Sequence, residues 1–153
     1  MTLEKLTDFS PCKVGYKIVF EDLETKTLWG ISNSSKELRV GEWLDEKEYR
    51  SVDVDTIIIL SKPQAERYSA ERYSVGWHVF HILKDAELVK SIHLSPTGYI
   101  LRIIEVEVSE SVATGCQFLA AKNLACTVAK KIKILKVLEL KAAKPTWLIG
   151  IRT

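Results

Sequence analysis

The sequence has few of the residues that cross-link small proteins. Its 153 residues include three cysteines, Cys12, Cys116 and Cys126, and no two of them are close enough to form a C-x-x-C pair. An odd count without short spacing is not the pattern of a disulfide framework or a zinc site. We therefore expect reduced thiols in a cytoplasmic protein that holds no metal and no other cofactor.

Long apolar runs are missing too. The longest ones, such as residues 57–60, fall far short of the roughly 18 residues that a membrane-spanning helix needs. Residues 1–5 contain an acid where a secretory signal would be basic, and no apolar block follows them. We expect a soluble protein that has no membrane-spanning segment and is not exported.

The common catalytic signatures are also absent. The chain contains no P-loop, no G-x-G-x-x-G, no G-x-S-x-G and no H-E-x-x-H motif. The usual signatures of nucleotide binding and hydrolysis are therefore missing, and we favour a binding function over an enzymatic one.

What is present is the composition of a packed domain. Hydrophobic residues make up 46% and charged residues 27% of the chain, which is long enough to bury about two thirds of its unfolded surface. We predict a single domain over residues 1–153. Short runs of apolar and β-branched residues, separated by turn formers, predict strands over 16–20, 27–32, 37–40, 53–60 and 76–81.

One segment, residues 82–93, has the periodicity of an amphipathic helix. Its apolar face comprises Ile82, Ala86, Val89 and His93. The residues predicted to face outward are Lys84, Asp85, Glu87 and Lys90. Pro96 and Gly98 end the helix.

Two long strands are predicted over 99–108 and 126–141, where apolar residues alternate with charged ones. The alternation changes phase at Leu135, which indicates a β-bulge. The segment 117–124, between these two strands, is predicted to form one or two helical turns. The segment 147–151, after them, is predicted to add a last short strand. The fold class is α+β, with a curved, mainly antiparallel sheet and one main helix, about 82–93, packed on it.

A five-residue unit is repeated, once over 65–69 and again over 70–74. A period of five suits neither a helix nor a strand. We predict an exposed loop or insertion over 61–75.

The C-terminal segment is basic. Residues 121–153 carry eight of the 22 basic residues but only one of the 20 acidic ones. This ribbon, with Lys131 and Lys133 at its centre, suggests nucleic-acid binding as one alternative. Trp147 is its single stacking platform, however, and lysines on a strand also prevent edge-to-edge aggregation.

The histidines do not form a metal-binding pattern. His78 and His81 are three residues apart on a predicted strand, so their side chains point to opposite faces. We expect His78 to be a partly buried, hydrogen-bonded residue.

The four tryptophans, Trp29, Trp43, Trp77 and Trp147, are predicted to lie mostly in the core, and two exposed together would mark a partner surface.

Several landmarks follow one another in a recognisable order over about residues 14–140. They are Tyr16-Lys17, Val40-Gly41-Glu42-Trp43, Gly76-Trp77-His78 with Phe80, Val106-Glu107-Val108, and Cys126 before residues 131–135. In these the chain resembles a family of small uncharacterised domains of phages and prophages. Phe80 stands where that family often has a cysteine, and 50–74 looks like an insertion. The resemblance implies a phage accessory protein in the host cytoplasm and no defined activity.

A second, looser similarity is to ADP-ribosyltransferase folds. It rests on the strand beginning at Gly76 and the helix after it, and it implies a pocket containing Tyr16, His78 and Glu105 or Glu107.

The interpretation that we favour is a protein–protein interaction module that binds a partner or itself. The candidate binding residues are Trp77, His78, Glu105, Lys131 and Lys133.

Overall fold

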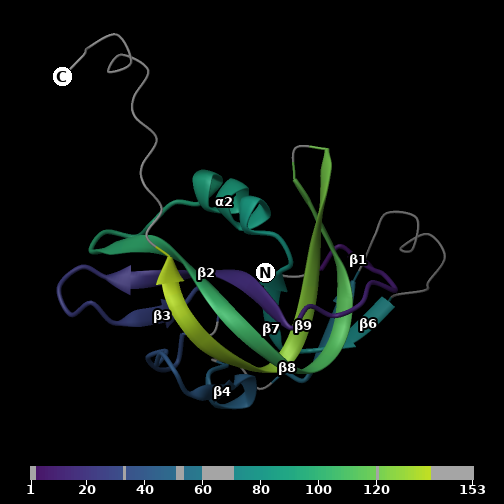
Figure 1. The fold of residues 1–153 in the computed structure, drawn as a ribbon, viewed down its shortest axis with the longest axis horizontal. Helices are drawn as coiled ribbons and strands as arrows, with labels where there is room; N and C mark the ends of the chain where they lie inside the picture. The colour runs from purple at the N-terminus through teal and green to yellow at the C-terminus, as the bar shows by residue number, and fades with distance from the viewer. Residues whose placement is uncertain (1–2, 33, 51–53, 60–70, 120, 139–153) are drawn as a thin grey trace, which may run out of the picture.

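The computed structural model describes residues 3–32, 34–50, 54–59, 71–119 and 121–138. These ranges form strands and one α-helix, which lies on one side of the curved sheet (Figure 1). In chain order the elements are β1 (Lys5–Leu6), β2 (Val14–Asp22), β3 (Leu28–Gly30), β4 (Trp43–Asp45), the 3-10 helix η1 (Glu46–Glu48), β5 (Thr56–Ile59), β6 (Glu71–Ser74), β7 (Trp77–Phe80), α2 (Leu83–Ile92), β8 (Tyr99–Leu119) and β9 (Lys122–Leu138).

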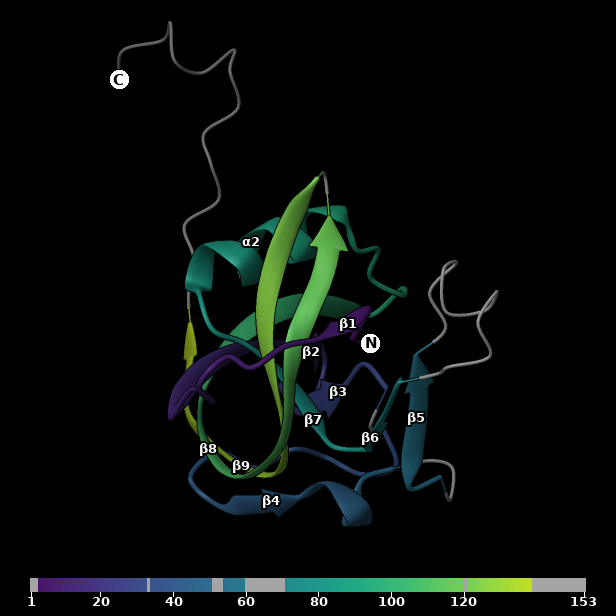
Figure 2. The ribbon, with the colours of Figure 1, turned by 90° about the vertical axis from the view of Figure 1, so that its right-hand side faces the viewer.

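The main sheet has the order β1-β8-β2-β7-β9-β4, with β3 paired to β2, and β5 and β6 form a separate pair. Strands β8 and β9 also pair with each other, so the path β8-β2-β7-β9 returns to its start. The closing contact between β2 and β7 is the pair Tyr16 and Phe80. The long strands bend strongly to make this ring possible (Figure 2). The predicted α+β class, with a curved antiparallel sheet and one main helix, is confirmed.

Strands β8 and β9 form a hairpin that extends well beyond the predicted strands. The expectation of helical turns over 117–124 is wrong, because Gln117 pairs with Leu124 and Leu119 with Lys122. The short Ala/Leu-rich run gave no decisive period, and ladder pairing satisfies its backbone groups instead. Ala121 turns the chain with a φ of 62°. The bulge predicted at Leu135 is confirmed, since Glu105 pairs with Lys136 while Val106 pairs with Ile134.

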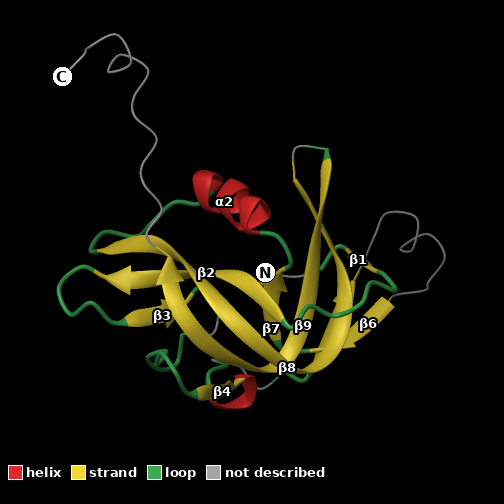
Figure 3. Ribbon diagram, in the orientation of Figure 1, coloured by secondary structure: helices red, strands yellow, loops and turns green. Residues whose placement is uncertain are grey.

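Two apolar clusters lie on opposite faces of the strands, because successive side chains alternate. Val19 and Ile104 belong to one cluster, which also buries Trp77. Ile18 and Ile103 belong to the other, which α2 covers (Figure 3).

Helix α2 confirms the predicted segment and corrects its faces. Ala86 and Val89 are buried as expected, whereas Ile82 and His93 are exposed at the two ends. Asp85, predicted to face outward, is buried and ion-paired to Lys122 Nζ at 2.9 Å. The carboxylate lies in the first turn, where the helix dipole stabilises a negative charge.

Two other predicted segments differ from the structure. The predicted strand 37–40 makes only isolated bridges, Leu28 to Leu38 and Val40 to Ile134. The predicted loop over 61–75 is wrong for residues 71–74, which form β6 and bury the ring of Tyr73. Residues 61–70 and the predicted strand 147–151 lie outside the described residues.

Candidate functional site

Two of the predicted binding residues, Trp77 and His78, are buried. The indole Nε1 of Trp77 donates to the carbonyl oxygen of Leu44 at 3.0 Å. The ring nitrogen Nε2 of His78 lies 2.9 Å from the hydroxyl of Tyr73, which accepts the backbone N–H of Leu3 at 2.8 Å. The hydroxyl of Tyr73 therefore joins the backbone of Leu3 to the ring of His78. The predicted hydrogen-bonding role of His78 is confirmed.

Burial determines the charge of His78. It lowers the pKa of His78 to about 3, with a further contribution from the nearby Lys17 cation. Burial also raises the pKa of Tyr73 to about 12, so the hydroxyl keeps its proton. Both side chains are therefore neutral at physiological pH, and the pair acts as a structural hydrogen bond inside the core.

Lys17 is a buried cation, and no described carboxylate forms an ion pair with it. Its Nζ donates to the carbonyl oxygen of His78 at 3.2 Å and lies 5.7 Å from the centre of the Trp77 ring. Burial lowers the pKa of Lys17 to about 8. The ammonium is held by a carbonyl dipole and an aromatic face, which compensate only part of the desolvation of the charge.

The remaining polar contacts near β7 are structural as well. His81 Nε2 lies 2.6 Å from the hydroxyl oxygen of Thr127, and that oxygen also accepts the backbone N–H of Cys12 at 3.1 Å. Burial raises the pKa of the Cys12 thiol, which makes it a poor nucleophile at neutral pH. Within the described ranges, no cluster of three or more His, Cys, Asp or Glu side chains is arranged to hold a metal ion.

The other predicted binding residues lie on the β8–β9 ladder, where acid and base alternate across the strands. Lys131 Nζ lies 3.4 Å from a Glu110 carboxylate oxygen, and Lys136 Nζ lies 3.9 Å from one of Glu105. Lys133 is directly opposite Glu107, and its ammonium lies 5.7 Å from the centre of the Trp43 ring. The three glutamates of β8 thus face three of the five lysines of β9.

The predicted site residues therefore do not form one site. Trp77 and His78 are inside the molecule, whereas Glu105, Lys131 and Lys133 are on a partly exposed ladder. Of the described tryptophans only Trp77 is fully buried. Trp29 is half-buried, and Trp43 is 46% exposed.

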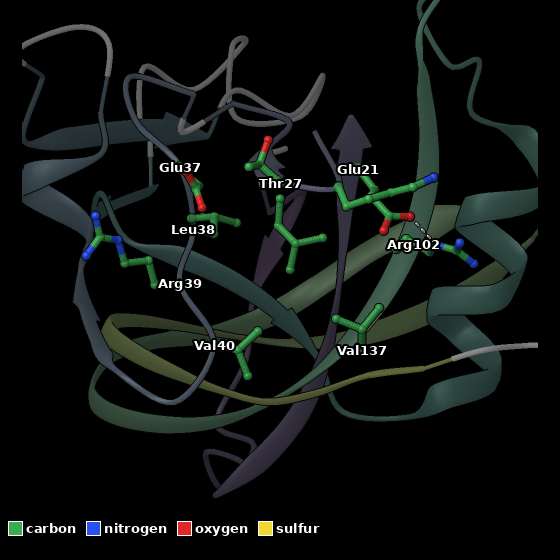
Figure 4. Close-up of a pocket in the computed structure, with 10 residues that line it drawn as sticks. Glu21, Thr27, Glu37, Leu38, Arg39, Val40, Arg102 and Val137 are labelled. Atoms are coloured by element: carbon green, nitrogen blue, oxygen red, sulfur yellow. Dashed lines mark hydrogen bonds and ion pairs between the residues drawn. The ribbon is translucent and has the colours of Figure 1, made fainter. Parts of the chain in front are cut away.

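A pocket of about 400 Å³ lies elsewhere, beside the β2–β3 hairpin (Figure 4). Its lining combines five segments: the end of β2, the start of β3 with the turn before it, the segment 37–40, one position of β8 and one position of β9. The apolar lining residues are Leu28, Leu38, Val40 and Val137. The polar and charged ones are Glu21, Lys26, Thr27, Glu37, Arg39 and Arg102.

The sheet register explains why these side chains meet. Val19 faces the inner apolar cluster, so Glu21, two residues later, faces the same way at the edge of that cluster. Arg102 is paired with Val19 across the strands and reaches Glu21 diagonally, with 2.7 Å between Nε and the carboxylate oxygen. Leu38 is held here by its bridge to Leu28.

The pocket presents charges of both signs around an apolar centre. In Figure 4, Leu38, Val40 and Val137 surround the middle, with Arg39 on one side and the Glu21–Arg102 pair on the other. Lys26, Glu37 and Arg39 form no ion pair with any described residue. They are therefore available to charged groups of a ligand.

Sequence reasoning missed this pocket because its residues are far apart in the chain. The one local signal was Val40, an apolar residue at the end of a short run and 52% exposed in the structure. Nothing in the spacing of Glu21 and Arg102, 81 residues apart, indicates that they touch.

No protein-family model, curated protein or solved structure matches this chain. The resemblance to small phage domains stays a prediction. Among the described residues, no helix combines the length and the apolar character needed to cross a bilayer.

Proposed function

We propose that this chain is a protein-binding module and that the mixed-charge pocket receives a segment of its partner. The single observation that carries the proposal is the combination of an apolar centre with three unpaired charged side chains, Lys26, Glu37 and Arg39, in one hollow. Interfaces commonly combine an apolar core with a charged rim that selects the partner.

The lining also suggests the kind of segment that fits. An apolar side chain would contact Leu38, Val40 and Val137. Acidic groups beside it would meet Lys26 or Arg39, and a basic group would meet Glu37. The Glu21–Arg102 ion pair already neutralises itself and would fix one wall.

The phage accessory role and the cytoplasmic location belong to the same proposal. Three free cysteines, two of them buried, suit a reducing compartment. Nucleic-acid binding through Lys131 and Lys133 has less support, because glutamates face the lysines of β9. An ADP-ribosyltransferase-like reaction has less support as well, since His78 is enclosed by the core and does not line the mixed-charge pocket.

The test uses peptides selected from a random library on the whole protein, with binding measured by fluorescence anisotropy. Val40→Asp places a carboxylate in the apolar part of the pocket. We expect this variant to bind the selected peptides with an affinity lower by about tenfold or more. Val54→Asp is the matched control, because Val54 is similarly exposed, 48% against 52%, but does not line the pocket. Arg39→Glu should shift the selected sequences from acidic to basic.

Two results of this experiment would overturn the proposal. Binding that Val40→Asp and Val54→Asp weaken equally would place the peptide elsewhere and overturn the proposal. So would a library that yields no enriched peptide. Preserved folding of both variants is checked by their circular dichroism and thermal melting.

A further inference from the structure

A second pocket, of about 330 Å³, lies on the opposite face of the β2–β3 hairpin. Phe20 of β2 is paired with Trp29 of β3, and the next pair along the hairpin is Glu21 with Leu28. Successive pairs point to opposite faces, so the first pair lines this pocket while the second lines the mixed-charge one. The full lining is Phe20, Trp29, Gly30, Ile31, Ser34, Pro96 and Tyr99.

Three aromatic rings converge here from three strands. The ring centres of Phe20 and Tyr99 are 6.1 Å apart, with their planes at 61°. The indole Nε1 of Trp29 donates to the hydroxyl of Thr27 at 2.9 Å, which fixes the orientation of the ring and occupies its one donor. All three rings are half-buried, so each keeps part of its surface for a ligand.

The uncharged, largely aromatic lining favours a quaternary ammonium group over a primary one. No lining residue carries a charge, and the side-chain acceptors of the lining are two hydroxyl groups, those of Ser34 and Tyr99. A primary ammonium would lose its hydrogen bonds to water here and find few acceptors. A quaternary ammonium has no N–H to satisfy and is attracted by the negative faces of aromatic rings.

An ionised carboxylate, that of Asp22, belongs to the strand face that carries Phe20. Asp22 is also the register partner of Tyr99. Its carboxylate accepts the backbone N–H groups of Glu24 and Thr25 at 2.8 and 3.1 Å, and these bonds lower the pKa of Asp22. The carboxylate therefore stays ionised and complements a bound cation.

We propose that the pocket formed by Phe20, Trp29 and Tyr99 is an aromatic cage that binds a quaternary ammonium group. The group could belong to a choline-type small molecule or to a trimethylated lysine of a protein, because both present the same trimethylammonium head. This inference is independent of the mixed-charge pocket and of its proposed partner.

The direct test compares choline with dimethylbutanol, its neutral isostere, in which carbon replaces the charged nitrogen. Binding to the whole protein is followed by the NMR shift of the Trp29 indole N–H. We expect choline to bind about tenfold more tightly than dimethylbutanol or better, because only the cation gains from the ring faces and from Asp22. Equal affinity for the two would overturn the proposal, and so would no binding of choline up to its solubility.

Variants locate the site on the protein. Tyr99→Leu and Trp29→Leu should each lower the affinity for choline about tenfold. The affinities of the variants are measured by isothermal titration calorimetry, because Trp29→Leu lacks the indole N–H that reports binding in the wild type. Trp43→Leu is the matched control, since Trp43 is an exposed tryptophan outside the pocket, and it should leave the affinity unchanged. Should Trp29→Leu fail to fold, Trp29→Phe retains a ring and Tyr99→Leu carries the test. Choline binding that none of the cage variants alters would contradict the assignment.

Two further ligands identify the source of the ammonium. A peptide with one trimethyl-lysine is compared with the same peptide carrying plain lysine, and both with choline. A preference for the trimethylated peptide over the plain one supports the cage and indicates a modified protein as its ligand. Tighter binding of choline than of the trimethylated peptide supports it and indicates a small molecule. Equal binding of the plain and trimethylated peptides would overturn it.

Discussion

Lys17 is the residue whose environment departs most from what its chemistry prefers. A lysine ammonium in water keeps three hydrogen bonds, whereas here one carbonyl oxygen and the face of Trp77 are its only described partners. His78, its neighbour, avoids the same cost by staying neutral. Buried polar groups of this kind make the stability of the fold depend on pH.

The sign of that dependence follows from the pKa of Lys17, which is about 8 in the folded protein against 10.5 for an unperturbed lysine. Between these values the unfolded chain binds a proton that the folded chain has released. The free energy of unfolding should therefore rise with pH across this window, by up to about 1.4 kcal/mol per pH unit. Urea unfolding, followed by tryptophan fluorescence at several pH values, measures this slope.

Lys17→Met removes the titrating group. We expect this variant to lose the rise between pH 8 and 10.5 and to be more stable than the wild type at pH 7 by about 1–3 kcal/mol. Lys13→Met, at an exposed lysine just before β2, is the control and should leave the slope unchanged. An unaltered slope in Lys17→Met would show that another group carries the pH dependence.

At the scale of elements, close backbone approaches decide how the short edge strands dock. Strand β1 lies on the distal part of β8, with Leu6 opposite Gly115. Its hydrogen bonds run from the Glu4 N–H to the Cys116 oxygen and from the Thr7 N–H to the Thr114 oxygen. A Cβ at Gly115 would lie 2.2 Å from the carbonyl oxygen of Lys5, closer than any real contact.

Gly115→Ala should therefore push β1 away from β8. We expect the amide protons of Glu4 and Thr7 to lose their protection against hydrogen exchange, while those of β2 keep theirs. The overall destabilisation should be about 1–3 kcal/mol, as for other overpacked sites. Ser111→Ala, at an exposed position of the same strand, is the control. Retained protection of Glu4 and Thr7 in Gly115→Ala would mean that the backbone accommodates the methyl group.

At the scale of the whole molecule, the folded arrangement balances charges that the sequence keeps in separate segments. The C-terminal segment is basic and the rest of the chain is acidic. The β8–β9 hairpin brings lysines of one segment opposite glutamates of the other, as in the Lys131–Glu110 and Lys136–Glu105 pairs. Because Lys131, Lys133 and Lys136 each face a glutamate of β8, this part of the ladder lacks the continuous positive charge that binds phosphates.

We accordingly expect no retardation of single-stranded or duplex oligonucleotides at physiological salt in a gel-shift experiment. At low salt any weak retardation should be smaller for a Lys131→Glu, Lys133→Glu double variant than for the wild type, because the two substitutions lower the net charge of +2 by four units. Retardation that persists at physiological salt and disappears in the double variant would restore the nucleic-acid hypothesis.

The spacing of apolar residues along the chain was enough to predict strands β8 and β9 and helix α2. The alternation in 99–108 and 126–141 predicted strands β8 and β9, and the phase change at Leu135 predicted the bulge, because side-chain direction in a strand follows directly from sequence position. The apolar period of 82–93 predicted α2 for the same reason, although it misplaced Asp85, whose burial depends on Lys122 from another element.

The tertiary structure decided the rest, because the decisive contacts join residues that are distant in the chain. The ring of strands depends on one pairing of Tyr16 with Phe80, and the mixed-charge pocket depends on Glu21 meeting Arg102. The aromatic pocket likewise combines Phe20 and Trp29 with Tyr99. The sequence by itself determined which residues could form strands and a helix. Only the folded chain determined which side chains share a surface, since register and crossovers are set by packing over the whole domain.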